Sequence, residues 1–403
     1  MKRWLAAAAI ALSSACTRTP PPLTDSALAA MDWPQIEAAA RGRTVTFVMW
    51  TGDPAINAYI ANFLAPRLAR QHDIRLRVVP GQADIANQVI AERDAGRSAS
   101  SLDLLWINGE TFFKLRQLQA LHGPFTERLP NNRYVRWSDP TIARDFQQPV
   151  EGYEMPWGNV QLLLIADRER VSPLPDTPAA LADWIHAHPG RFSFDSGFTG
   201  LSFLKSLMHA FAESPEALAG PFDEAAYLRL RDRVFDWLRA VRADLWRQGR
   251  NFPRDVAQLH QLFAAGEIDF TMSFNDGEVD NKIALGQFPA SAEGYALSTG
   301  MLRNSHYLGI PAKARERAAA MVVINELLSP EAQFEKLKPA VWGDGTVLDV
   351  ERLPAPWPAR FAEAAARSRV PSRAALAAIA RPEPAPELMI RLEQDFRHAF
   401  VEN

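Results

Sequence analysis

Short runs of hydrophobic residues alternate along the chain with longer stretches whose apolar residues lie three or four positions apart. The short runs are rich in β-branched and aromatic residues, which predicts buried strands, and the longer stretches predict amphipathic helices. Strands that alternate with helices form parallel β-α-β units, so the chain is predicted to have an α/β fold. The predicted strands are residues 44–50, 74–79, 102–107, 160–166, 191–195, 269–274 and 307–311, and the predicted helices include residues 84–92, 111–121, 176–188, 201–211, 227–246, 256–265 and 318–328.

The stretch at residues 153–170, YEMPWGNVQLLLIADRER, divides this pattern into two sets of strands and helices. Its apolar run at 160–166 is too short for a typical helix and suits a buried strand. We interpret it as the strand that leaves one lobe and enters the other, with Trp157-Gly158-Asn159 at the hinge. A buried strand inside one large sheet is the alternative.

The chain is also long enough to need two cores. Its 403 residues exceed the size at which a single hydrophobic core usually keeps growing. The predicted architecture has two α/β lobes, in which each lobe is a mostly parallel sheet flanked by helices and crossing strands form the hinge. The first lobe is predicted at residues 32–155 plus 303–330, and the second at residues 156–302 plus 331–403.

The first fifteen residues have the layout of a secretory signal peptide. Lys2 and Arg3 precede an apolar run at 4–12, and three small residues follow at 13–15. This order of segments predicts export, and the expected location is the periplasm.

Cys16 follows the small residues directly and resembles the acylated cysteine of bacterial lipoproteins. A Ser-x-Ala site for ordinary cleavage fits the same residues, so a lipid anchor and a freely soluble chain both stay open. Residues 16–31 are predicted to be a tether, because 17–22 (TRTPPP) is polar and rich in proline.

Composition narrows the function classes. The net charge of −3 gives no reason to expect nucleic-acid binding, and no apolar run approaches the roughly 20 residues of a membrane span. Cys16 is the only cysteine, which excludes an internal disulfide and a cysteine-based metal site. No histidine has a partner at metal-ligand spacing, so neither a metal nor a cofactor is expected. No G-x-S-x-G or H-E-x-x-H motif points to a hydrolase.

A repeated pattern of an aromatic residue, a glycine and an acid marks four loops, three of them at predicted strand ends. Ligands of open α/β sheets bind beyond the carboxyl ends of the strands, so these loops predict a binding cleft. The loops are residues 50–53, 106–110, 274–278 and 342–345. A turn at 196–200 adds free backbone N–H groups at a helix start, which suit an anion, although plain capping is the commoner use of such residues.

The candidate ligand contacts come from these segments and from the hinge. They are Trp50, Asp53, Trp106, Asn108, Glu110, Trp157, Ser196, Phe198, Thr199, Phe274, Asn275, Asp276 and Trp342, with Glu278 as a further acid. Aromatic faces attract cations, and carboxylates pair with them, so the set favours a thiazolium or a polyamine. Each tryptophan can instead be a core residue and each acid a helix cap, and tryptophan also stacks on sugars.

Several stretches resemble extracytoplasmic solute-binding proteins of ABC importers, and more closely the YnjB-like branch, which is related to thiamine, spermidine/putrescine and iron binders. They read WTGDPAINAYI, LDLLWINGE, YEMPWGNVQLLLIADRE and LFAAGEIDFTMSFNDGE. The resemblance implies the type II periplasmic-binding-protein fold, in which two hinged lobes close on a small solute. The implied partners are a membrane permease and an ATPase. The resemblance also implies ligand contacts at Trp50, Asp53, Trp106, Glu110, Trp157, Phe274 and Asp276.

The favoured function is therefore that of a monomeric, non-catalytic receptor for a cationic, thiamine-like or polyamine-like solute. A receptor for a sugar or for a metal complex is the alternative. A secreted hydrolase and a scaffold at the cell envelope are weaker hypotheses, which ligand-dependent stabilisation and compaction would separate from a receptor.

Overall fold

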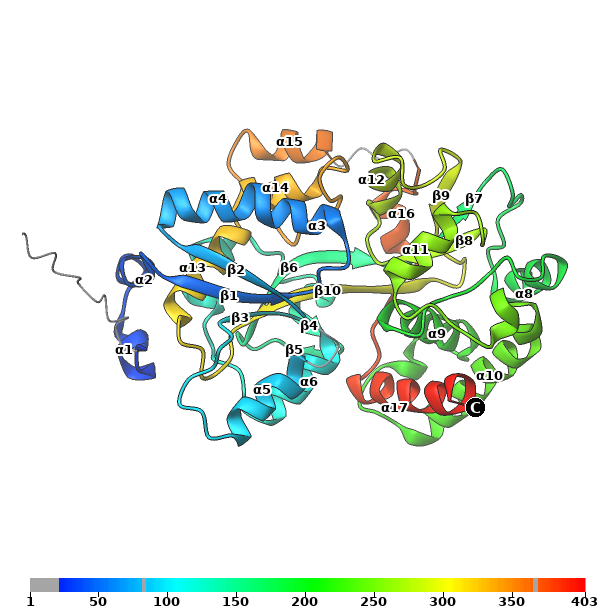
Figure 1. The fold of residues 1–403 in the computed structure, drawn as a ribbon, viewed down its shortest axis with the longest axis horizontal. Helices are drawn as coiled ribbons and strands as arrows, with labels where there is room; N and C mark the ends of the chain where they lie inside the picture. The colour runs from blue at the N-terminus through cyan, green and yellow to red at the C-terminus, as the bar shows by residue number, and fades with distance from the viewer. Residues whose placement is uncertain (1–21, 82–84, 365–368, 403) are drawn as a thin grey trace, which may run out of the picture.

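The computed structural model describes residues 22–81, 85–364 and 369–402, which form two halves joined by a pair of long strands (Figure 1). Separate hydrophobic cores fill the two halves. The first core is built around Phe47 and Trp157, and the second around Phe192 and Phe203. The predicted two-lobe α/β architecture is confirmed.

The first half contains a mixed sheet in which β1 is the centre of a parallel trio. β1 pairs in parallel with β2 on one side and with β3 on the other. β10 then runs antiparallel to both β3 and β6, and β11 joins the far end of β10 in parallel. The strands are β1 (Thr44–Met49), β2 (Arg75–Pro80), β3 (Leu104–Ile107), β6 (Glu154–Gln161), β10 (Met301–Gly309) and β11 (Ala380–Pro382).

Helices cover both faces of this sheet, as Figure 1 shows for α3, α4 and α14 above it and for α5 and α6 below it. The helices of the first half are α2 (Trp33–Ala40), α3 (Pro54–Ala58), α4 (Ala65–Arg67), α5 (Ile85–Asp94), α6 (Gly109–Gln117), α7 (Pro140–Ala143), α13 (Arg317–Leu327), α14 (Pro330–Leu337) and α15 (Trp357–Ala364). A small hairpin, β4 (Arg144–Asp145) and β5 (Gln148–Pro149), lies at the junction with the second half.

The second half surrounds the sheet β8-β7-β9 in the described part of the chain. Its strands are β7 (Leu163–Asp167), β8 (Phe270–Ser273) and β9 (Ala292–Tyr295). Its helices are α8 (Pro178–Ala187), α9 (Phe198–Phe211), α10 (Glu224–Val241), α11 (Val256–Ala264), α12 (Glu278–Ala284), α16 (Arg373–Ala378) and α17 (Pro386–Phe396). α9 is the central helix of this half, since almost every residue from Thr199 to His209 is buried.

The hinge consists of β6 and β10, which pass side by side from one half to the other (Figure 1). The antiparallel pairing runs from the Glu154–Gly309 pair to the Gln161–Arg303 pair, and its register is irregular between His306 and Tyr307. The predicted crossing at 153–170 is therefore confirmed. The single apolar run at 160–166 is split, because Leu162 separates β6 from β7.

Strand direction in the second half differs from the sequence prediction of a mostly parallel sheet. β7 pairs antiparallel with both β8 and β9. The direction of β7 is inherited from the hinge strand β6 that it continues, and no β-α-β crossover sets it. The predicted strand at 191–195 is absent from the described strands, although the carbonyl oxygen of Arg191 accepts a hydrogen bond from the N–H of Asp269.

The N-terminal prediction needs a partial correction. Residues 1–21, which contain the expected signal peptide and Cys16, lie outside the described residues. Part of the predicted 16–31 tether is instead the helix α1 (Asp25–Ala30). Leu28 is fully buried against the first half, and Arg317 donates hydrogen bonds to Asp25 and to the carbonyl of Leu23, so this segment packs.

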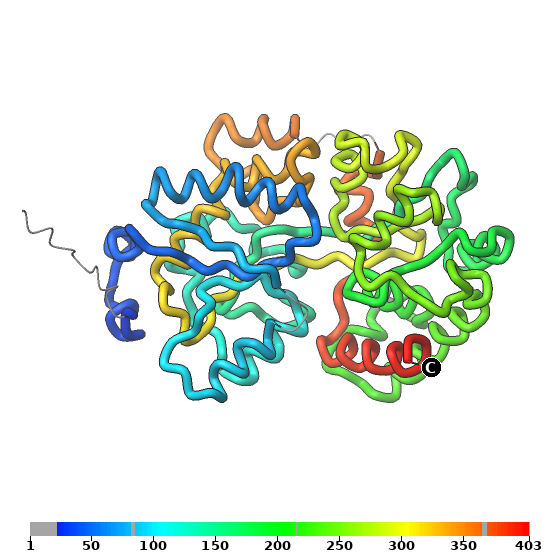
Figure 2. Tube along the Cα trace, in the orientation of Figure 1, coloured from blue at the N-terminus to red at the C-terminus, as the bar shows by residue number. Residues whose placement is uncertain are grey.

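The C-terminal part divides between the halves, whereas the sequence placed all of residues 331–403 in the second lobe. Leu337, Trp342, Leu348 and Phe361 pack in the first core, while the apolar face of α17 packs in the second. Figure 2 shows the orange segment over the first half and the red segment against the second. The apolar side chains after α13 continue along the face of the first sheet, which accounts for the difference.

Candidate functional site

The predicted strand ends of the first half lie at one edge of its sheet, because β1 and β3 are parallel neighbours. β1 leads through Trp50 to Asp53, the N-cap of α3, and β3 leads through Asn108 to Glu110 in the first turn of α6. The Trp50 ring lies over Gly52, where an added Cβ would meet ring atom Cζ2 at 2.4 Å. Trp50 is 36% exposed, so part of this residue is accessible to a ligand.

Asp53 connects the two halves. Its Oδ2 lies 2.6 Å from Nζ of Lys282 on α12, and its Oδ1 accepts a 2.6 Å hydrogen bond from the N–H of Ala55. Burial alone would raise the pKa of Asp53, but the charge and hydrogen bond of Lys282 hold that pKa below its ordinary value. The predicted ligand carboxylate is therefore already paired with a cation from the opposite half. Glu278 also lies 3.6 Å from Lys282.

Replacing Lys282 with methionine is expected to separate the halves in solution. Asp53 would then be buried without its cation, which costs the closed arrangement about 2 kcal/mol or more, and opening lets water reach the carboxylate. Small-angle scattering should give a larger radius of gyration, with unchanged circular dichroism. Lys313→Met on the exposed surface is the matched control and should scatter like the unmodified protein. Equal radii for both variants would contradict the role assigned to this pair.

Three of the predicted tryptophans come together beside the hinge. The ring centroid of Trp157 lies 5.0 Å from that of Trp106 and 5.3 Å from that of Trp342, and His306 lies 5.1 Å away. Trp157 is fully buried and Trp342 nearly so, and both belong to the first core. Trp157 and Trp342 therefore pack in the core. Of the three tryptophans, Trp106 is half-buried and remains partly accessible. Ligand contact by these side chains stays a prediction.

The second half contributes the predicted residues at the start of α9 and the end of β8. The rings of Phe198 and Phe274 lie 5.3 Å apart. Ser196 and the buried Thr199 flank Phe198, and the Ser196 hydroxyl donates to the carbonyl of Pro253 at 3.3 Å. The start of α9 is tightly packed, because a Cβ on Gly200 would lie 1.7 Å from the carbonyl oxygen of Asp195.

The loop after β8 is held by contacts within the protein. Asn275 donates to the carbonyl of Trp342 at 3.0 Å, which joins this loop to the loop that follows α14. Asp276 accepts two hydrogen bonds from the Arg373 guanidinium, at 3.0 and 2.9 Å. Asp276 thus has a protein cation as its partner, as Asp53 does, and contact of either acid with a solute stays a prediction.

Glu110 differs from the other predicted acids. It is half-buried, its Oε2 has no hydrogen-bond partner among the described residues, and burial raises its pKa. Sequence reasoning missed several of the charged groups that act on it, which include Asp145, Lys205 and Glu383. One signal was available, because Lys205 interrupts the apolar run LSFLKSLMHA, and a lysine inside a buried helix requires an acidic partner.

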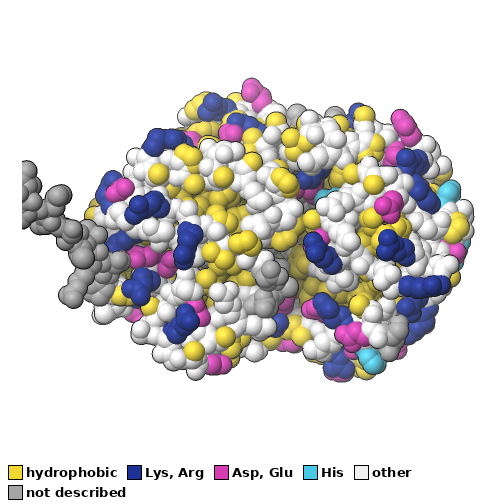
Figure 3. Space-filling model, viewed as in Figure 1, with side chains coloured by type: hydrophobic (Ala, Val, Ile, Leu, Met, Phe, Trp, Pro, Cys, Tyr) yellow, Lys and Arg dark blue, Asp and Glu magenta, His cyan; other side chains and the backbone are white. Residues whose placement is uncertain are grey.

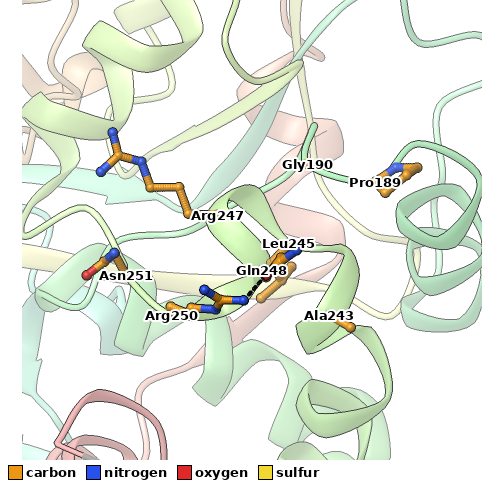
Figure 4. A pocket seen from close by; sticks show the side chains of 8 residues that line it. All are labelled: Pro189, Gly190, Ala243, Leu245, Arg247, Gln248, Arg250 and Asn251. Carbon is orange, nitrogen blue, oxygen red and sulfur yellow. Dashed lines mark hydrogen bonds between the residues drawn. The ribbon is translucent and has the colours of Figure 1, made fainter.

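Two cavities lie away from these residues. One, of about 540 Å³, lies in the second half and is lined by Arg247, Gln248 and Arg250 among others (Figure 4). The second, of about 430 Å³, lies in the first half and is lined by Arg43, Arg75 and others. Acidic and basic side chains are interspersed over both halves of the face in Figure 3. Within the described ranges, no group of three or more His, Cys, Asp or Glu side chains is placed to hold a metal ion.

Comparison with known proteins identifies the family. Residues 58–363 match the family described as "Bacterial extracellular solute-binding protein". The chain is 39% identical over 330 residues to Protein YnjB of Escherichia coli (strain K12), covering 81% of this chain and 84% of that protein. None of the described helices is long and apolar enough to span a bilayer.

Solved structures share the fold at low sequence identity. The periplasmic binding protein AfuA of Actinobacillus pleuropneumoniae, solved with fructose-6-phosphate, has a TM-score of 0.63 and 13% identity over 89% of this chain and 98% of its own. A putative spermidine/putrescine ABC transporter of Listeria monocytogenes has a TM-score of 0.62 and 17% identity over 88% and 98%. Iron-bound HitA of Pseudomonas aeruginosa has a TM-score of 0.58 and 17% identity over 87% and 98%. The family match, the sequence relative and the two hinged halves agree: the chain belongs to the bacterial extracellular solute-binding protein family.

Proposed function

We propose that this protein is the substrate-binding component of an ABC importer, and that it captures a small cationic organic solute between its two halves. A membrane permease and its ATPase would receive the solute. Export by residues 1–15, and either acylation or release at Cys16, belong to the same proposal. Several proteins of the same fold carry ABC transporter or polyamine names, and YnjB is a relative over most of both chains.

One observation carries the proposal beyond the family. The strand ends of the first half face the helices of the second half, as the 2.6 Å contact between Asp53 and Lys282 shows. A solute that touches both sides of this junction would stabilise the closed arrangement through contacts that the open form lacks. Trp50 is partly exposed at this sheet edge, and Glu110 has a buried carboxylate oxygen without a hydrogen-bond partner among the described residues, a combination that suits a positively charged nitrogen.

Thermal unfolding with a panel of solutes tests the proposal. Spermidine, putrescine and thiamine represent organic cations, glucose and fructose-6-phosphate represent sugars, and ferric citrate represents metal complexes. A cation at about 100 times its dissociation constant should stabilise the protein by about 2.7 kcal/mol. Mass spectrometry should recover that solute unchanged, as expected for a receptor. Stabilisation by a sugar or by ferric citrate alone would overturn the assignment of a cation, and consumption of the solute would indicate an enzyme.

A further inference from the structure

A group of charged side chains is buried where the two halves meet. Asp145 on β4 is 1% exposed, and Glu154 at the start of β6 is 0% exposed. Lys205 on α9 is also fully buried, and Glu383 follows β11. Glu110 on α6 completes the group of five side chains. We call Glu110, Asp145 and Glu154 the junction carboxylates. The five side chains come from both halves of the molecule.

Lys205 neutralises only one acid of this group. Its Nζ lies 2.5 Å from Oε2 of Glu383, whose Oε1 accepts a 2.7 Å hydrogen bond from Asn304. In the part of the chain that the structure describes, both carboxylate oxygens of Asp145 and both of Glu154 lack a hydrogen-bond partner. Among the described residues these two carboxylates are thus almost completely removed from water without a hydrogen-bond donor or a salt bridge, which is a costly arrangement for ionised groups.

The surroundings disfavour negative charge on these acids. Burial raises the pKa of Asp145 well above its ordinary value, and repulsion from Glu110 and Glu383 adds to this, with only Lys205 opposing it. Burial likewise raises the pKa of Glu154, repulsion from Asp145 adds to it, and Arg116 on α6 opposes it. Tyr307 on β10 gives no relief, because its hydroxyl donates to backbone carbonyls, including that of Arg144 at 2.9 Å. Asp145 and Glu154 are therefore stable in this position only if they are protonated or if a further cation neutralises their charge.

Aromatic rings accompany the junction carboxylates. Lys205 Nζ lies 4.3 Å from the ring centroid of Phe146 and 5.8 Å from that of Phe198, which shows that the rings already accommodate an ammonium group. Phe146 follows Asp145 directly in the turn of the β4–β5 hairpin and has a positive φ of 42°. Gln147, the next residue, donates to the carbonyls of Leu218 and Glu383 in the second half, so the hairpin spans the junction.

We propose that Asp145 and Glu154, together with Glu110, form an anionic subsite that binds the positively charged nitrogen of an organic solute, with Phe146 and Phe198 beside it. The subsite rests on the proposed function and adds to it two residues that the sequence did not single out. α6 contacts α17, and Lys205 lies on α9, so the group includes residues from both halves. We expect separation of the halves to expose the group to solvent. Protons held between the acids are the competing explanation for their burial.

Neutral variants of the same shape separate these explanations. We would measure the affinity of Asp145→Asn and Glu154→Gln for spermidine, putrescine and thiamine by calorimetry at pH 7.5. Each variant should lose about 10- to 100-fold in affinity for the cation that binds the unmodified protein best, as expected when a charged hydrogen bond is lost. The unliganded variants should melt no lower than the unmodified protein. Glu127→Gln, which removes an exposed charge from the first half, is the control and should bind normally.

The pH dependence gives a second measurement that needs no variant. The folded protein holds protons on these acids more tightly than the unfolded chain does, so their contribution to stability is present at low pH and is lost as the pH rises toward their raised pKa. Cation affinity should change in the opposite sense and increase from pH 5 to pH 7.5 as the carboxylates ionise. Both trends should weaken in Asp145→Asn and Glu154→Gln.

The outcomes distinguish the subsite from the wider function. Cation binding by the unmodified protein with equal affinity in both variants, or with no pH dependence, would refute the subsite and leave the receptor proposal standing. Failure of all three cations to bind the unmodified protein would refute the cationic solute itself, and the subsite with it. Variants that do not fold would leave the pH profile of the unmodified protein as the deciding result.

Discussion

Replacing Lys336 with methionine is expected to lower the free energy of unfolding by about 3–5 kcal/mol. Lys336 and Asp344 are both almost fully buried in the first half, and Nζ of Lys336 lies 2.6 Å from Oδ2 of Asp344. Burial lowers the pKa of Lys336, whereas Asp344 keeps its own pKa below the ordinary value because Lys336 and His306 outweigh the effect of burial. Without the ammonium group, Asp344 would be a buried carboxylate next to His306 alone.

Urea unfolding followed by circular dichroism measures this loss. Lys338→Met is the matched control two residues along the chain, because Lys338 pairs with Glu335 near the surface and should contribute about 0–1 kcal/mol. The double variant Lys336→Met/Asp344→Asn should recover part of the stability, since no unpaired buried charge is left. A cost below about 1 kcal/mol in the single variant would show that water reaches this pair.

Trp157→Ala is expected to destabilise the first half by about 3–5 kcal/mol, the range measured when a buried aromatic side chain is truncated. The Trp157 side chain is fully buried and packs against Phe47, Trp106 and Trp342 at centroid distances of 6.4, 5.0 and 5.3 Å. Its loss would leave a cavity between the hinge and the first sheet. Denaturant unfolding is the measurement, with solute affinity determined below the transition.

Trp50→Ala provides the comparison, because Trp50 is 36% exposed and its ring lies over Gly52. Its truncation should cost about 1 kcal/mol or less in stability but should weaken binding of the solute. The opposite result, a stable Trp157→Ala protein that has lost only its ligand, would make Trp157 a contact residue, as the hinge stretch suggested from the sequence.

The hydrophobic pattern of the sequence was sufficient to predict most strands of the first half and the strand that crosses the hinge. The strand predicted at 44–50 is observed as β1, and the predicted crossing is observed as β6 followed by β7. β9 and β11 were missed because they are short and contain few β-branched residues: AEGY and ARP. The split of the C-terminal segment could not be read from the chain, since local pattern does not say which of two cores an amphipathic helix joins.

The site prediction was limited because a linear sequence does not show which side chains pair or pack with one another across the fold. Asp53 and Asp276 were chosen as acids near aromatic residues, and the structure gives them Lys282 and Arg373 as partners. Trp157 and Trp342 were predicted as ligand contacts, and the structure places both in the first core, whereas their contact with a solute stays a prediction. Asp145 and Glu154 escaped notice because nothing local distinguishes a buried acid from a solvated one, and only the long-range contacts that bury them do so.

The hydrogen-bonded pairing of β6 with β10 restricts how the protein can move. Two neighbouring strands that share a ladder can bend and twist together, but they cannot slide past each other without breaking their backbone hydrogen bonds. We therefore expect any opening to be a rotation about this pair of strands, with the bend at the irregular step between His306 and Tyr307. A membrane partner would in consequence meet one well-defined sequence of orientations whatever solute is carried.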